Sequence, residues 1–238
     1  MAKLFNKTRK TIIKEGKTAN YLKYAIGEIV LVVIGILIAL QINNWNEKRK
    51  EHLTERILLT NLKEDLSRNK EIIQSNISGL NFILARINLL LTAHTENRAY
   101  NDSLNGYFHL ARVFPESPIS FVTFDEIKTK GTDIIESTDL RKKIVELFEI
   151  TLSNMIETTS RLEGALRPIQ LEHQLRNFFS GDTLGLIPND GEKIMLNSEY
   201  FNIVSQRRLY YKMFIAMKEN CIKEIDIVQN LIDQELIN

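Results

Sequence analysis

The feature that most constrains this chain is a long apolar segment near its start. Residues 24–42 read YAIGEIVLVVIGILIALQI, and the run from Ile29 to Leu40 contains no polar residue. A helix needs about 20 predominantly apolar residues to cross about 30 Å of hydrocarbon, so this segment is long enough to span a bilayer. Tyr21 and Trp45 lie on its two flanks, where aromatic side chains favour the membrane interface. The sequence therefore predicts a transmembrane helix over 24–45.

The flanks of this segment predict its processing and its orientation. A cleaved signal peptide is the competing interpretation, but the run is longer than a usual signal-peptide core and no small-residue cleavage pattern follows it. Residues 1–23 carry seven Lys or Arg against Glu15 alone, whereas residues 46–65 carry five basic and five acidic residues. Because basic residues beside a span stay on the cytoplasmic side, we expect an uncleaved signal anchor. Residues 1–23 would form a cytoplasmic basic tail, and 46–238 an extracytoplasmic domain.

The composition indicates one ordinary domain beside this anchor. The 238 residues are 44% hydrophobic and 26% charged, which is typical of a globular chain that buries a core. The net charge of +1 gives no global field that would attract nucleic acid, so nucleic-acid binding is not expected. The single cysteine, Cys221, excludes an intramolecular disulfide.

A long amphipathic helix is predicted after the anchor, because no proline and only Gly79 occurs between Ile36 and Arg98. Its apolar seam follows a heptad pattern, with eight of ten positions apolar. The seam consists of Leu59, Leu62, Leu66, Asn69, Ile73, Asn76, Leu80, Ile83, Ile87 and Leu90. We expect a stalk over about 46–97, continuous with the anchor.

Two interpretations of this seam stay open. Either two chains pair along it as a coiled coil, with Asn69 and Asn76 as register residues, or helices that begin near Asp139 and Ser198 of the same chain fill it. The two asparagines also fit positions at which the apolar stripe turns toward solvent.

The remainder predicts an all-α antiparallel helical bundle. Helices are expected over about 103–114, 123–130, 138–166, 168–179 and 198–237. Thr123 and Glu126 have capping-box spacing, Gly131 suits the stop that follows, and Pro168 is expected to break or kink its helix. A small hairpin near 184–196 is the one strand pair expected, formed by Leu184–Ile187 and Ile194–Leu196.

The last helix carries a regular apolar stripe that we expect to face the core. The stripe consists of Tyr210, Phe214, Met217, Cys221, Ile225, Val228, Ile232 and Leu236. Cys221 is interpreted as a small buried hydrophobe and not as a nucleophile, because no base falls near it on the same helix.

The anchor region resembles a known family. EGKTANYLKYAIGEIVLVVIGILIALQINNWNEKRKE is similar to the N-terminal signature of an uncharacterised family of small single-pass inner-membrane proteins of Bacteroidota, over roughly residues 14–51. The stretch FVTFDEIKTKGTDIIESTDLRKKIVELFE is similar to a second segment of that family. The resemblance implies a bacterial inner membrane and a periplasmic domain. It implies no activity and no catalytic residue.

Two features of the anchor are candidates for contacts within the membrane. Glu28 lies inside the apolar segment, where it either snorkels to the interface, binds a partner helix or couples to protons. Gly27, Gly35 and Ala39 share one helix face, which permits close approach of a second helix. This pattern is also common by chance, so self-association stays a hypothesis.

No motif for catalysis, a cofactor or a metal was found in the sequence, and the four histidines show no ligand spacing. The leading expectation is a membrane-anchored helical interaction or scaffold module. A periplasmic ligand-sensing bundle that acts through a partner is the second, and an enzyme with an unrecognised site the third. The expected partners are the bilayer, a second copy of the chain and an unknown membrane or periplasmic protein.

Overall fold

The computed structural model describes residues 18–116, 118–180 and 185–237, and it is nearly all helical, as the sequence predicts. The chain divides into two compact units, Met1–Thr54 and Glu55–Asn238. The helix α2, Thr18–Thr95, contributes to both, so anchor and stalk belong to one continuous helix. The cytoplasmic tail expected over 1–23 lies largely outside the described residues.

In the first unit, α2 carries the apolar segment. An 18-residue stretch of this helix reaches a mean hydropathy of 2.6, and none of it is buried. Leu31 is 74% exposed and Trp45 is 65% exposed. Among the described residues this is one helix long and apolar enough to cross a membrane.

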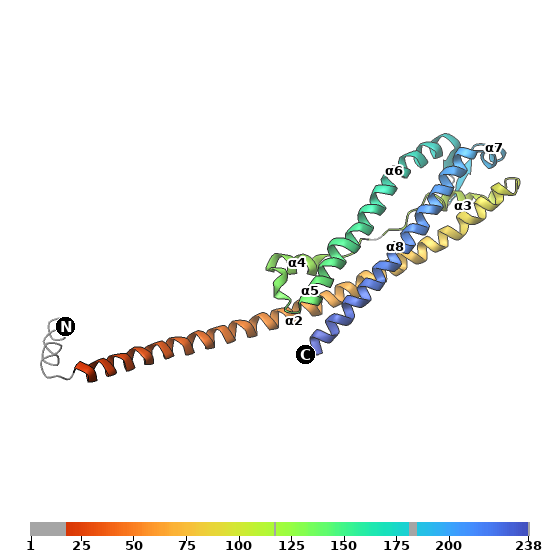
Figure 1. The fold of residues 1–238 in the computed structure, drawn as a ribbon. Coiled ribbons are helices and arrows are strands. Elements are labelled where there is room, and N and C mark those ends of the chain that lie inside the picture. The colour runs from red at the N-terminus through yellow and green to blue at the C-terminus, as the bar shows by residue number, and fades with distance from the viewer. Residues whose placement is uncertain (1–17, 117, 181–184, 238) are drawn as a thin grey trace. The chain divides into compact units, whose positions relative to one another are not determined.

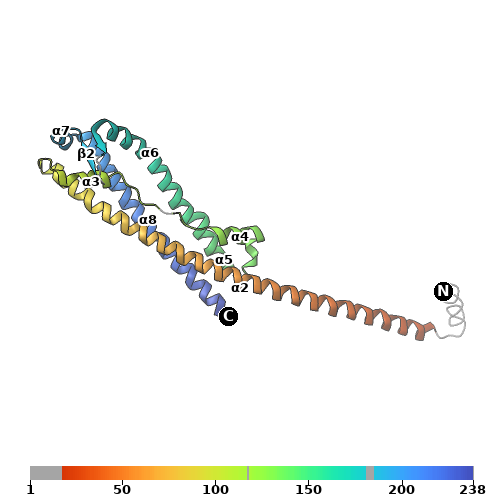
Figure 2. The same cartoon turned by 180° about the vertical axis from the view of Figure 1, so that it is seen from behind.

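The second unit is built on two long helices that run side by side in opposite directions, α2 and α8, Ser198–Ile237 (Figures 1 and 2). Lys70 and Asp226 form an ion pair between them at 2.5 Å, and the Gln229 amide donates to Ser67 Oγ at 2.8 Å. All ten seam positions of α2 are at least 95% buried within this single chain. The chain's own helices therefore cover the seam, which is the second of the two interpretations.

The short elements after α2 lie near both ends of the bundle. They are η1 Asp102–Leu104, α3 Asn105–Leu110, α4 Val122–Lys130 and η2 Thr132–Ile134. Gly131 ends α4 with a φ of 99°, as its position predicts. The predicted capping box does not form. Instead Asp65 of α2 accepts hydrogen bonds from the Thr123 backbone N–H at 3.2 Å and its hydroxyl at 2.5 Å, so a residue distant in sequence caps α4.

A three-part helical run follows, made of α5 Thr138–Val145, the π-helix η3 Glu146–Leu152 and α6 Ser153–Asn177. The Ser137 side chain accepts a hydrogen bond from Leu140 N and caps the start of this run, close to the predicted helix start at residue 138. The sequence predicts either a break or a kink at Pro168, and the break is wrong, because α6 continues through this residue. Pro168 removes only the N–H that would bond the Gly164 carbonyl, and both residues are exposed, so water can satisfy that carbonyl.

The small hairpin differs in part from the prediction. The first predicted strand, Leu184–Ile187, overlaps the observed strand Leu186–Pro188, although Leu184 itself lies outside the described residues, whereas the second predicted strand is not formed. β1 Phe178–Ser180 pairs antiparallel with β2 Leu186–Pro188. The segment expected as a second strand is the helix α7, Gly191–Met195, because the Asp190 side chain accepts from Lys193 N and acts as its N-cap.

Candidate functional site

The intramembrane candidates lie on the exposed surface of α2. Glu28, Gly27, Gly35 and Ala39 are all exposed within the first unit. A Cβ atom added at Gly27 or Gly35 would meet nothing within 4 Å, so no contact inside the chain requires glycine at either position. Their roles stay predictions.

Asn69 and Asn76 are core residues of the bundle, at 0% and 5% exposure, which contradicts the solvent-facing interpretation. The Asn69 side-chain NH₂ donates to the Ser120 carbonyl at 2.8 Å, and its oxygen accepts from Ser120 N–H at 2.7 Å. Through these two hydrogen bonds, Asn69 of α2 holds the segment before α4 against α2. Pairing with a second chain at this position would require the bundle to open.

A buried group of charged and polar side chains lies between α6 and α8. We call it the ionic cluster, and it consists of Glu163, Gln170, Arg207 and Lys218, with Glu116 beside them. Arg207 is fully buried and pairs with Glu163, while its second terminal nitrogen donates to the Gln170 side-chain oxygen at 2.5 Å. Gln170 in turn donates to the Ala111 carbonyl at 2.8 Å. This chain of bonds connects α6 and α8 to the segment after α3.

The charges of this cluster are not all matched. Burial lowers the pKa of Lys218, and the nearby Glu116 opposes that effect. Partial desolvation raises the pKa of Glu116 although the residue is exposed overall. Arg207 Nε and Thr159 Oγ1 are buried without a hydrogen-bond partner in the described part of the chain. Shifted pKa values of this kind mark functional sites and also structural ion pairs.

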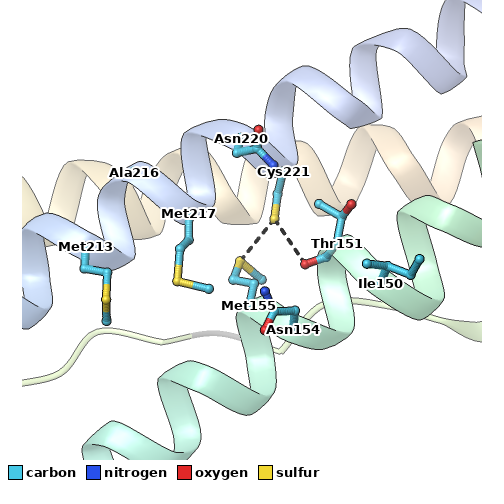
Figure 3. A pocket seen from close by; sticks show the side chains of 9 residues that line it. All are labelled: Ile150, Thr151, Asn154, Met155, Met213, Ala216, Met217, Asn220 and Cys221. Atoms are coloured by element: carbon cyan, nitrogen blue, oxygen red, sulfur yellow. Dashed lines mark hydrogen bonds between the residues drawn. The ribbon is translucent and has the colours of Figure 1, made fainter.

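Adjacent to the ionic cluster, η3, α6 and α8 enclose an open cavity of about 460 Å³. We call it the sulfur cavity, because Met155, Met213, Met217 and Cys221 line it (Figure 3). The Cys221 thiol lies 3.5 Å from the Met155 sulfur and 3.9 Å from the Thr151 carbonyl, to which it donates. Burial raises the pKa of Cys221 to about 11, so the free residue is a neutral thiol.

Three of the four described histidines, His94, His109 and His173, lie in the second unit and occupy separate environments. His94 stacks on Phe201 at 3.7 Å between ring centroids, and its Nδ1 lies 2.7 Å from the Met195 carbonyl oxygen. His173 stacks on Tyr200. Both therefore serve packing at the α7 end of the bundle.

Sequence reasoning missed both the ionic cluster and the sulfur cavity. Arg207 and Lys218 occupy buried positions of α8 that the predicted apolar stripe does not include. Tyr210 of the predicted stripe is half-buried, whereas its neighbour Tyr211 is fully buried. The spacing Met213, Met217, Cys221 was a usable signal, because residues four apart share a helix face.

Fold and sites together define a helical bundle joined to a helix that can span a membrane. Residues 28–90 match a family described as "Family of unknown function (DUF6090)", which is consistent with the resemblance to an uncharacterised family. The matched region joins the apolar segment to the buried seam of α2. No curated protein and no solved structure matches the chain.

Proposed function

We propose that this chain is a single-pass protein of a bacterial inner membrane that holds a helical interaction or scaffold module in the periplasm. The observation that carries the proposal is the stretch of α2 with mean hydropathy 2.6 and no burial. Residues from Glu55 onward contribute two apolar cores to the other unit. A lipid bilayer would remove this exposed apolar segment from water, and that transfer is favourable for an apolar surface of this extent.

Charge supports the orientation. The seven basic residues before Tyr24 would stay in the cytoplasm, and the balanced sequence after Trp45 would be exported. The resemblance to a Bacteroidota family supports the inner membrane as the location. The bilayer is thus the first partner.

The anchor also offers a surface for a protein partner. Gly27, Gly35 and Ala39 leave room for a second helix to approach closely, and a polar group on that helix could contact Glu28. The partner helix belongs either to a second copy or to another membrane protein. Such a contact would tie the exported bundle to a membrane complex.

Topology tests the central claim. A reporter active only after export is fused behind Asn238, and protease is applied to intact spheroplasts. We expect an active reporter and loss of nearly everything beyond Trp45. A reporter active only in the cytoplasm would overturn the orientation, and recovery of the protein in the soluble fraction would overturn the anchor.

A ligand-sensing bundle is the second candidate, and the sulfur cavity favours it, because a cavity of about 460 Å³ is within the size range of small-molecule sites. A ligand screen by thermal shift on the purified chain separates the two. Stabilisation by a small molecule supports sensing, whereas affinity capture of a defined membrane partner without such a ligand supports the scaffold.

A further inference from the structure

Sulfur atoms are concentrated at one place in the bundle. The sequence contains five methionines and one cysteine, and three of these methionines join the cysteine around the sulfur cavity. They come from two helices that are separate in sequence, since α8 supplies Met213, Met217 and Cys221 and α6 supplies Met155. A cavity with this lining is rich in soft, polarisable ligands.

The bottom of the sulfur cavity is buried, and its opening is accessible from the surface. Cys221 and Met155 are 1% and 3% exposed, whereas Met217 and Met213 are half-buried. Figure 3 shows the side chains of Met217 and Met155 directed toward one another, with the Cys221 thiol close to the Met155 sulfur. Met213 lies one helical turn before Met217 on α8. The four sulfurs thus lead from the surface inward.

We propose that the sulfur cavity binds one soft monovalent metal ion, Cu(I) or its analogue Ag(I), through the thiolate of Cys221 and the thioethers of Met155 and Met217. Met213 is the outer ligand on the path of entry. This site goes beyond the scaffold function and does not depend on it.

The distances suit one shared ion. Zinc–thiolate bonds are about 2.3 Å long. With metal–sulfur bonds of that length, trigonal coordination holds the sulfurs about 4 Å apart. The observed separation of Cys221 Sγ and Met155 Sδ is 3.5 Å. Methionine has three rotatable side-chain bonds, so small rotations open the required space.

Charge selects a monovalent ion. Binding breaks the Cys221 S–H bond, forms a sulfur–metal bond and releases the proton to water, so one thiolate and one M⁺ leave the site neutral. A divalent ion would leave one uncompensated positive charge beside buried Lys218, which is costly in a desolvated site. The cavity residues of η3 and α6 are Ile150, Thr151, Asn154 and Met155, and none of them supplies an anion. Soft thiolate and thioether ligands favour Cu(I) over hard cations.

The π-helix η3 provides independent support. It supplies Ile150 and Thr151 to the cavity wall, and the Thr151 carbonyl accepts a hydrogen bond from the Cys221 thiol in the metal-free chain. π-helical turns occur frequently at functional sites. The competing explanation is that these sulfurs fill the core as ordinary apolar side chains, which methionine and cysteine often do.

The test uses the full chain, purified in detergent without oxygen, with Cu(I) supplied through the competing chelator bicinchoninate. We expect one Cu(I) per chain, X-ray absorption with sulfur as the coordinating element, and protection of Cys221 from alkylation. Loss of a residue that only orients a ligand lowers metal affinity about 10- to 100-fold, so Cys221→Ser and Met155→Leu should weaken binding by at least about tenfold.

Controls separate metal binding from packing. Met195→Leu alters a buried methionine outside the cavity and should leave the affinity unchanged, while Met213→Leu should weaken binding less than Met155→Leu. Helical circular dichroism shows which variants fold. Failure of the wild-type chain to take Cu(I) from the chelator would overturn the proposal, as would wild-type affinity in a folded Cys221→Ser variant or equal competition by Zn²⁺.

Discussion

Arg207 and Lys218 are both buried basic residues of α8. Because their surroundings differ, removing the charge of each residue should have a different effect on stability. Arg207 is paired with Glu163 and Gln170, whereas Lys218 faces the exposed Glu116. A buried carboxylate that loses its partner is strongly destabilising, while replacing a poorly compensated buried charge with an apolar side chain is often neutral or favourable.

We therefore expect Arg207→Met to lower the free energy of unfolding by about 3–5 kcal/mol, because it leaves Glu163 buried without its cation. Lys218→Met should be neutral or stabilising. Arg208→Met is the matched control, since its side chain is only half-buried, and it should change little. Thermal and urea unfolding followed by circular dichroism measure all three. Equal losses for Arg207→Met and Lys218→Met would contradict this assignment.

The Asp65 carboxylate caps the start of α4, and its contribution to stability depends on pH. Burial raises its pKa, but the hydrogen bonds from Thr123 and Arg68 outweigh that effect, so its pKa lies below the ordinary value of 3.8. A carboxylate with a lowered folded-state pKa stabilises the fold above its unfolded pKa and loses that contribution as pH falls through the folded pKa.

Asp65→Ala should accordingly cost about 1 kcal/mol at neutral pH, the usual effect of removing a helix cap. The difference from wild type should shrink as pH falls from 3.8 into the acid range. Glu64→Ala, which removes an exposed neighbour, should show neither effect. Unfolding curves at a series of pH values decide, and a constant difference through the acid range would refute the pH argument.

At the scale of elements, the sequence predicted the features that depend on neighbouring residues along the chain. The seam of α2 and the positions Phe214, Cys221 and Ile225 of α8 follow from periodicity, and the stop at Gly131 follows from its backbone freedom. Contacts between distant residues were out of reach, as the cap that Asp65 supplies to Thr123 shows.

The same limit explains the errors at β2, α7 and the ionic cluster. The sequence Pro188–Gly191 fits both a hairpin turn and a helix cap, and only the pairing of Phe178–Ser180 with Leu186–Pro188 decides between them. Arg207 can occupy an apolar stripe because Glu163 lies opposite, 44 residues away in sequence. Periodicity within one helix contains no information about that partner.

Packing along α8 leads to a sharp test of the core. Phe214 is fully buried and contacts Phe114 edge-on at 5.6 Å between ring centroids. Phe214→Asp should destabilise the bundle by more than about 4 kcal/mol, because truncation of a buried Phe costs about 3–5 kcal/mol and an unpaired charge is added. Leu209→Asp, on an exposed position of α8, should keep the helical circular dichroism signal. Retained cooperative melting of Phe214→Asp would contradict the core assignment.

At the scale of the whole molecule, the two units have different requirements for solvent. The described part of the first unit exposes its apolar side chains, whereas apolar residues from Leu58 to Ile232 form the buried cores of the second. The charged residues that connect α2 with α8, such as Lys70 and Asp226, also lie beyond Thr54. Residues 55–238 thus contain both apolar cores and the ion pair between α2 and α8.

A chain of residues 55–238 should therefore be soluble, strongly helical and cooperative in thermal unfolding. The full chain should sediment with membranes and resist extraction by alkaline carbonate. Ultracentrifugation and circular dichroism check both. Aggregation of the shortened chain would show that the first unit contributes to the fold of the second.

The last prediction concerns self-association, and it follows from which surfaces the chain leaves uncovered. Single cysteines are placed at Ala39, Leu59 and Asn69 in a Cys221→Ser background, and membranes are oxidised. Leu59 and Asn69 are 1% and 0% exposed within the bundle, so they should not link. Ala39 is exposed on the small-residue face of α2 and should form disulfide dimers if anchors pair through that face.

Leu37→Cys is the matched control, because a step of two residues places it on the opposite side of the same helix, where it is 58% exposed. Linking at Ala39 but not at Leu37 would locate the dimer contact on the face of Gly27 and Gly35. Equal linking at both positions would indicate random collision in the membrane. Efficient linking at Leu59 would mean that the bundle opens and that two seams pair, and no linking at any position would exclude a dimer through this helix.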